Sequence, residues 1–225
     1  MIPGADQVIF CPRCDAPALV ATLVSGNTFG TVVWTDGYRY APMLPEPPAL
    51  ARCHGCGKVF WLKQAREGGS LPGDEKEMSA KQKVWSQAPG VTPANAVQIY
   101  AALKEGLAAS EVEEFEARTY AWWRQNDKFR KGEAKRTDVL DSLTAYNLEW
   151  LLAFHRRHSA RDQLACSELL RELGRCEEAQ AELQGLELEA GTPLASVKAQ
   201  MSWLCWRGDT SVRALDFEFR PRSEE

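Results

Sequence analysis

The sequence of 225 residues contains no apolar run close to the ~18–20 residues that a membrane-spanning helix needs. Its first residues, Met1 to Asp6, lack the basic region and apolar core of a signal peptide. It also has no phosphate-binding glycine loop, no nucleophile elbow and no His-Glu-x-x-His motif. These absences argue against membrane, secreted and common enzyme classes, and they predict a cytoplasmic, non-catalytic protein.

Neither the N-terminal part of the chain nor the helical part has a strong excess of basic residues. The net charge is −4. Residues 1–63 carry five Lys and Arg against four Asp and Glu, and residues 93–225 carry eighteen against twenty-three. Neither half has the basic balance expected of a dedicated DNA-binding domain.

Two Cys-x-x-Cys hooks stand out, Cys11-Pro12-Arg13-Cys14 and Cys53-His54-Gly55-Cys56. Two residues between cysteines let one tight turn aim both sulfurs at a single ion, and zinc prefers four such ligands in a tetrahedron. We therefore predict one structural Zn²⁺ per chain, held by Cys11, Cys14, Cys53 and Cys56. Four thiolates close the coordination shell, which disfavours a catalytic zinc.

There are four alternatives to structural zinc. Iron bound between the same hooks, or a redox-active dithiol, would use the same cysteines. Disulfides are disfavoured in a reducing compartment. His54 lies inside the second hook and could replace a cysteine, although Cys56 already completes that hook.

Strand-like sequence follows each hook, Ala18–Val24 after the first and Lys58–Leu62 after the second. Cys-Pro-x-Cys and Cys-x-x-Cys-Gly hooks followed by strands resemble the zinc-ribbon family, which implies a small antiparallel domain over residues 1–63. The intervening segment, residues 15–52, exceeds the usual ~15–20 residues. Within it, Asp36-Gly37 between two strand-like runs predicts a hairpin with a type I′ turn, which would enlarge the ribbon sheet.

Residues 64–92 are polar and rich in glycine and proline, so they are expected to form a linker. From residue 93 the apolar period becomes helical, and six helices are expected before Trp206. The alternation in residues 212–220 predicts a final edge strand.

One helical stretch contains Gly174, followed by Glu178 and Ala179. It resembles the tetratricopeptide repeat (TPR) family, in which a glycine ends the first helix of a repeat and a Glu-Ala pair lies in the opening of the second. Cys176 replaces the usual aromatic residue. The resemblance implies a TPR-like array over residues 93–225. The complete chain also resembles uncharacterised bacterial proteins that join a ribbon to helical repeats, and the expected fold class is α+β.

Grooves of helical repeats capture peptides with aromatic, Asn and Arg side chains. The candidate partner-binding residues are Trp123, Arg124, Asn126, Asp127, Arg130 and Asn147. The alternative places the two asparagines and the tryptophans inside the helical bundle, because buried polar groups also need partners.

Three functions follow from these patterns. The first is a zinc-binding adaptor that holds a protein or peptide in a helical-repeat groove. The second is a regulator that grips nucleic acid through the ribbon and the basic stretch 124–136. The third is an enzyme, for which His155, His158 and Cys166 offer a poorly supported second site.

Overall fold

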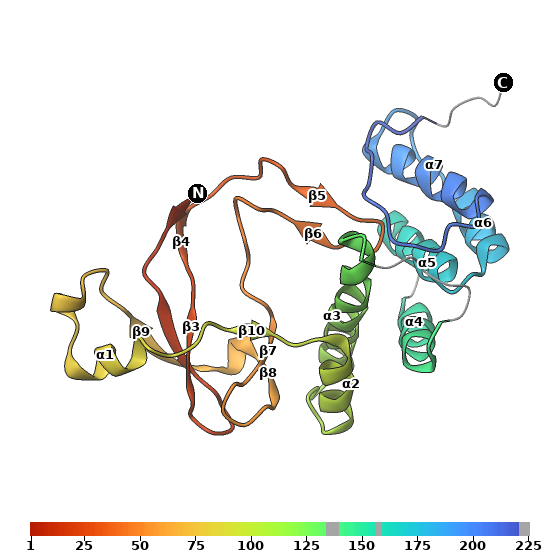
Figure 1. Ribbon diagram of the computed structural model, residues 1–225. Coiled ribbons are helices and arrows are strands. Elements are labelled where there is room, and N and C mark those ends of the chain that lie inside the picture. Colours follow the sequence, from red (N-terminus) through yellow and green to blue (C-terminus); the bar gives the residue numbers. More distant parts are fainter. Residues whose placement is uncertain (134–139, 156–158, 221–225) are drawn as a thin grey trace. The chain divides into compact units, whose positions relative to one another are not determined.

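The computed structural model describes residues 1–133, 140–155 and 159–220. The fold is α+β, with helices and small antiparallel sheets (Figure 1). The chain divides into two compact units. Unit 1 comprises Met1–Thr31 and Ala41–Ala121, and unit 2 comprises Val32–Tyr40 and Trp122–Glu225. These units differ from the domains expected from sequence, because a short segment between the hooks belongs to the helical unit.

Unit 1 is built on three small antiparallel sheets. The first sheet pairs β1 (Ile2–Pro3) with β4 (Leu23–Ser25). The second has the order β3-β2-β9, formed by β3 (Pro17–Val20), β2 (Gln7–Phe10) and β9 (Arg66–Ser70). The third has the order β10-β7-β8, formed by β10 (Thr92–Pro93), β7 (Leu50–Arg52) and β8 (Val59–Trp61). Each hook therefore joins two neighbouring antiparallel strands, β2 to β3 and β7 to β8.

The segment predicted to be a linker is part of unit 1. Within residues 64–92, β9 pairs along β2, and α1 (Ala80–Trp85) begins with a capping box between Ser79 and Gln82. The rings of Trp85 and Phe10 meet edge to face at 5.3 Å. Two short 3-10 turns complete the segment, Leu62–Gln64 and Glu75–Glu77. The linker prediction was wrong because glycine-rich β9 contributes backbone hydrogen bonds, which composition does not reveal.

Helix α2 (Ala96–Lys104) and the start of α3 (Glu111–Arg130) complete the core of unit 1. Asn95 and Gln98 form a capping box at the start of α2. Ile99 on α2 packs in one buried cluster with Leu50 and Trp61 of the third sheet. The indole N–H of Trp61 donates to the carbonyl of Leu107 at 3.2 Å. This packing fixes the strands that carry the second hook.

The hairpin predicted at Asp36-Gly37 is present and belongs to unit 2. It pairs β5 (Val32–Val33) with β6 (Arg39–Tyr40). Gly37 has φ 79°, whereas Asp36 is outside the left-handed region, so the predicted type I′ turn was wrong. The N–H of Gly37 donates to Trp34 O and the N–H of Trp34 donates to Tyr38 O, as in a three-residue loop that ends in a left-handed glycine.

Unit 2 contains the end of α3 and four further helices. They are α4 (Ser142–Phe154), α5 (Ala160–Glu172), α6 (Cys176–Gln184) and α7 (Pro193–Trp206). The expected six helices between residues 93 and 206 are present among the described residues, but α2 and the start of α3 belong to unit 1. Gly174, with φ 79°, separates α5 from α6 as predicted, and Ala179 and Leu183 of α6 are buried.

The C-terminal segment pairs with the hairpin. Trp34 forms an antiparallel bridge with Ala214, and the N–H of Leu215 donates to Val33 O at 2.8 Å. The final edge strand predicted over residues 212–220 was therefore wrong, because the segment makes an isolated bridge to the hairpin of unit 2 and no strand. Across the described ranges of the chain, no helix combines the length and the apolar character needed to cross a membrane.

Candidate metal centre

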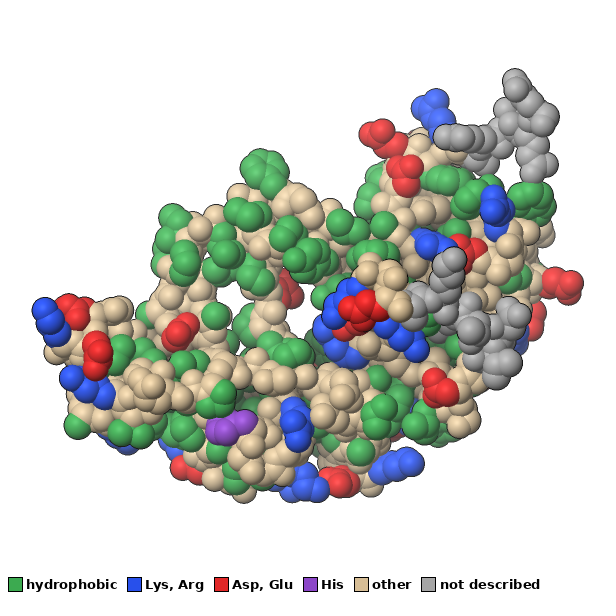
Figure 2. All heavy atoms as spheres, in the orientation of Figure 1, with side chains coloured by type: hydrophobic (Ala, Val, Ile, Leu, Met, Phe, Trp, Pro, Cys, Tyr) green, Lys and Arg blue, Asp and Glu red, His purple; other side chains and the backbone are tan. Residues whose placement is uncertain are grey.

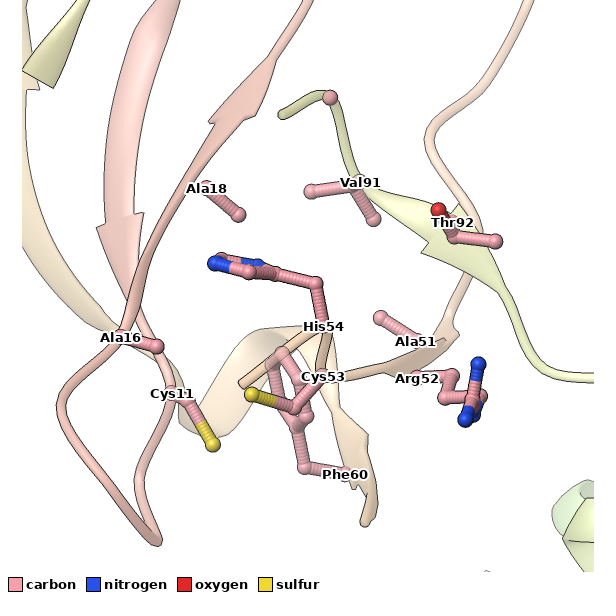
Figure 3. Close-up of a pocket in the computed structure, with 11 residues that line it drawn as sticks. Cys11, Ala16, Ala18, Ala51, Arg52, Cys53, His54, Phe60, Val91 and Thr92 are labelled. Atoms are coloured by element: carbon pink, nitrogen blue, oxygen red, sulfur yellow. The ribbon is translucent and has the colours of Figure 1, made fainter. Parts of the chain in front are cut away.

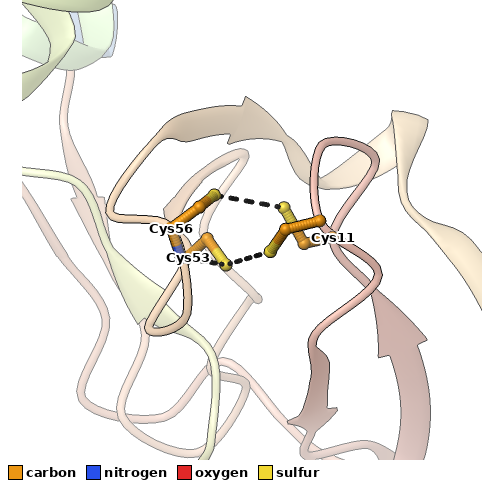
Figure 4. Close-up of side chains that lie close together, drawn as sticks. Cys11, Cys53 and Cys56 are labelled. Carbon is orange, nitrogen blue, oxygen red and sulfur yellow. Dashed lines mark hydrogen bonds between the residues drawn. The ribbon is translucent and has the colours of Figure 1, made fainter.

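The four predicted cysteines lie together. Their Sγ atoms are all within 4.8 Å of one another. Cys11 Sγ is 3.9 Å from Cys56 Sγ (Figure 4), and Cys14 Sγ is 3.5 Å from Cys53 Sγ. A tetrahedral ion with metal–sulfur bonds of ~2.3 Å requires sulfur–sulfur distances of about 3.8 Å. Both distances are close to that value, so the four cysteines could hold one metal ion.

The two hooks share one backbone geometry. In each, the fifth residue donates its N–H to the carbonyl of the first cysteine at 3.0 Å, and the third residue donates its N–H to that cysteine's Sγ. The first cysteine of each hook also donates its N–H across the turn, at 3.0 Å in Cys11 and 2.9 Å in Cys53. The fifth residues are Asp15 and Gly57, and both adopt positive φ. Each turn therefore directs two sulfurs to the same point.

Burial separates the ligands into two kinds. Cys11 and Cys53 are buried at 4% exposure, whereas Cys14 and Cys56 are exposed. The inner cysteines pack against Ile9 and Phe60 in a small apolar cluster. A metal ion here would lie at the edge of that cluster and join two sheets of unit 1.

The inner thiols differ in acidity because their surroundings differ. Burial raises the pKa of Cys11 to about 12. Burial also opposes ionisation of Cys53, but the N–H groups of Cys56 and Gly55 and the thiol of Cys14 lower its pKa to about 7. Amide N–H groups directed at a sulfur favour the thiolate, which is the form that binds a metal.

His54 is not part of the sulfur cluster. Its imidazole lies towards Ala18 and Val91, away from the sulfur atoms of Cys11 and Cys53 (Figure 3). The cavity beside these residues measures about 10 Å³, which leaves room for one water molecule at most. The geometry therefore favours four sulfur ligands over a set that includes His54.

Three predicted partner-binding residues hold the chain's own hairpin. The indole N–H of Trp123 donates to the carbonyl of Asp36 at 3.0 Å, and Asn126 Nδ2 donates to Asp36 Oδ2 at 2.9 Å. Arg130 forms an ion pair with the same carboxylate, and its guanidinium lies 4.3 Å from the ring centre of Tyr38. The segment that these three residues bind is part of the same chain, and their binding of a separate partner stays a prediction.

The remaining candidates are distributed differently. Asn126 and Asn147 have no exposed surface, which agrees with the core alternative and corrects their placement on an open face. Arg124 and Asp127 are half-buried and form an ion pair at 3.1 Å. Within the basic stretch 124–136, residues 134–136 lie outside the described part, and Lys128 and Lys131 are exposed. In the described part of the stretch, Arg124 and Arg130 pair with acidic side chains, and the two lysines are exposed.

Sequence reasoning missed a buried ionic cluster in unit 2. We define the ion cluster as Asp36, Arg130, Glu168, Arg171 and Glu172, whose side chains are almost completely buried. Arg171 donates to both carboxylate oxygens of Glu168, at 2.8 and 2.5 Å, and Asn126 donates to Glu172 at 2.9 Å. The signal available in the sequence was a Glu-x-x-Arg pair inside the apolar run of α5.

The proposed second site near His155 is not assembled in the described residues. His155 Nδ1 lies 3.6 Å from Asp162 Oδ1, and Cys166 is completely buried in α5. His158 lies outside the described residues. The only clustered metal donors found in the described residues are the four cysteines.

Two surfaces in the described residues are suited to contact. A groove of about 420 Å³ runs over α4, α5 and α6, lined by Leu152, Gln163, Leu170, Arg175, Glu178, Ala181, Glu182 and Gly185. In unit 1, apolar side chains gather over β1 and β4 (Figure 2), where Ile2 and Val24 are 57% and 72% exposed. Exposed apolar surface of this kind often marks contact sites.

Comparison with known proteins provides no relative. No family model, no curated protein and no solved structure matches the chain.

Proposed function

We propose that this chain is a non-catalytic adaptor whose zinc-ribbon-like module is folded around one structural Zn²⁺. The observation that carries the proposal is the cluster of four Sγ atoms within 4.8 Å, formed by two hooks of matching geometry. Zinc bound by four thiolates has no open position for water or substrate, so it stabilises the fold and does not catalyse a reaction.

Zinc is the metal that this donor set favours. A small tetrahedral site of four thiolates suits Zn²⁺, although iron accepts the same ligands in related knuckles. Iron would be recognised by its visible absorption, which Zn²⁺ lacks because its d shell is full.

The adaptor role is supported by the TPR-like helix pair α5–α6 and the groove beside it. Leu152 and Leu170 supply an apolar floor, and the rim carries Arg175 among acidic side chains. Such a combination fits a peptide that inserts an apolar side chain and places a basic group at the rim. The groove replaces the face that was predicted around Asn126 and Asn147.

Nucleic-acid binding receives less support. Arg124 and Arg130 are engaged by acidic side chains, Asp127 and Asp36, and so they are poorly placed to contact phosphates. Nucleic acid that co-purifies and dissociates with rising salt would nevertheless favour this second function.

The test has two parts. The metal content of the wild-type chain is measured, and the proteins that co-purify with the wild type and with one groove variant are compared. We expect one zinc per chain and a stoichiometric protein partner. Ala181→Arg, which adds bulk and charge to the groove, should remove that partner, whereas Ala101→Arg, at an exposed alanine of α2, should retain it. Absence of bound metal would refute the structural zinc. Retention of the partner by Ala181→Arg would show that the groove is not the binding site.

A further inference from the structure

Within unit 2, the helices α3 and α5 bind the tip of the hairpin much as they would bind a separate ligand. The carboxylate of Asp36 accepts hydrogen bonds from Asn126 and Arg130, and it is 4% exposed. Beside it, the hydroxyl of Thr35 donates to Glu168 at 2.5 Å. Charged groups in a buried site need such partners, so the hairpin and the helices depend on each other.

The hairpin is also joined to the C-terminal segment. The N–H of Thr35 donates to Arg213 O at 2.8 Å, and the N–H of Arg213 donates to Thr35 Oγ1 at 3.1 Å. By itself the hairpin has only two residue pairs, Val32 with Tyr40 and Val33 with Arg39. A two-stranded hairpin of this size is unstable in water, so its formation requires docking to unit 2.

The position of the hairpin in the chain connects it to the metal centre. It lies between the two hooks, and the segments on both sides of it belong to unit 1. The facing cysteines Cys14 and Cys53 are 39 positions apart. Closing a loop of that length costs chain entropy, and the cost falls when the two arms of the loop are already tied together.

We propose that metal binding in unit 1 and hairpin docking in unit 2 stabilise each other. A docked hairpin holds Val32 beside Tyr40, which ties the two arms that lead to the hooks and lowers the entropy cost of bringing the four sulfurs together. A bound ion ties the same arms at their other ends and lowers the cost of forming the hairpin. The proposal rests on the proposed zinc site, and the coupling must be equal in both directions.

The first experiment measures zinc affinity by competition with a chromophoric chelator in the full-length chain. Asp36→Ala removes the bound carboxylate and should weaken zinc binding by about fivefold or more, within the usual range of coupling between sites. The matched control is Phe29→Ala, because Phe29 lies on the same insert and is 79% exposed. Its zinc affinity should equal that of the wild type.

The second experiment removes zinc and measures the effect on the hairpin, so the ion cluster is not altered. Hydrogen exchange is followed at the amides of Thr35 and Leu215, which bond to Arg213 O and Val33 O. We expect faster exchange at both amides when zinc is removed, and in Cys14→Ser at equal zinc concentration. This measurement remains valid if Asp36→Ala fails to fold.

The outcomes separate this inference from the proposed function. Zinc binding by the wild type, with an unchanged affinity in Asp36→Ala or unchanged exchange at Thr35 and Leu215, overturns the coupling and leaves the zinc site intact. Absence of zinc binding by the wild type overturns both.

Discussion

Asp15 and Gly57 occupy equivalent backbone positions in the two cysteine hooks, with φ angles of 58° and 71°. Each donates its N–H to the carbonyl of the first cysteine of its hook. Glycine adopts this conformation without strain, whereas a residue with a side chain pays about 1 kcal/mol. Asp15 is the one described residue other than glycine with positive φ. The first hook therefore keeps the same geometry although Asp15, unlike glycine, is strained at this φ angle.

Replacement of Asp15 by glycine should stabilise unit 1 by about 0.5–1 kcal/mol, because the backbone strain disappears. The lost ion pair with Arg66 is exposed on both sides and contributes little. Denaturant unfolding of the zinc-bound chain measures the change. The reciprocal variant Gly57→Ala should destabilise unit 1 by a similar amount, and a stability loss in Asp15→Gly would contradict the strain argument.

Loss of one metal ligand should unfold the zinc-dependent part of unit 1. Cys11→Ser removes a buried ligand, and we expect zinc content to fall well below one per chain with loss of β-sheet amide protection. Cys176→Ser is the matched control, because Cys176 is on α6 and outside the sulfur cluster. Metal analysis and hydrogen exchange test this. Full protection of β2 and β7 in metal-free Cys11→Ser would show that the metal is not structural.

Truncation of Arg171 should be far more costly than truncation of Arg175. Arg171 is completely buried with Glu168, and its removal leaves that carboxylate without its bidentate partner, at a cost of about 3–5 kcal/mol. Arg175 pairs with Glu149 and Glu178 near the surface, where such pairs contribute about 0–1 kcal/mol. Denaturant midpoints of Arg171→Ala and Arg175→Ala provide the comparison. Equal losses of unfolding free energy in the two variants would contradict the expected cost of leaving Glu168 buried without Arg171.

The stability of unit 2 should depend on the protonation of Asp36. Burial raises the pKa of Asp36 from 3.8 to about 7, Arg130 opposes the shift and Glu172 adds to it. The folded state thus binds this proton more tightly than the unfolded chain. The free energy of unfolding should consequently fall as pH rises from about 4 to about 7, by at most ~1.4 kcal/mol per pH unit.

Asp36→Asn removes this titration and keeps a side chain of the same shape. Relative to wild type, the variant should gain stability as pH rises through the same range. Denaturant unfolding at several pH values, with zinc in excess, gives the difference between the two chains. Parallel pH profiles for wild type and Asp36→Asn would disprove the contribution of Asp36.

The sequence by itself determined the features that depend on local spacing. Two residues between cysteines sufficed to predict the ligand set, since a single turn positions each pair. Gly174 predicted the end of α5, because a left-handed residue was needed there. Asp36-Gly37 located the hairpin for the same reason, although the turn type was wrong.

Tertiary structure decided which of these elements belong together. The hairpin was assigned to the ribbon because it lies between the hooks, yet its Asp36 binds Asn126 and Arg130, 90 and 94 positions away. Glycine-rich β9 joined unit 1 through backbone hydrogen bonds to β2, and the same glycines had indicated a linker. The buried carboxylate of Asp36 is stable only because partners from distant segments converge on it, and local spacing contains no information about that convergence.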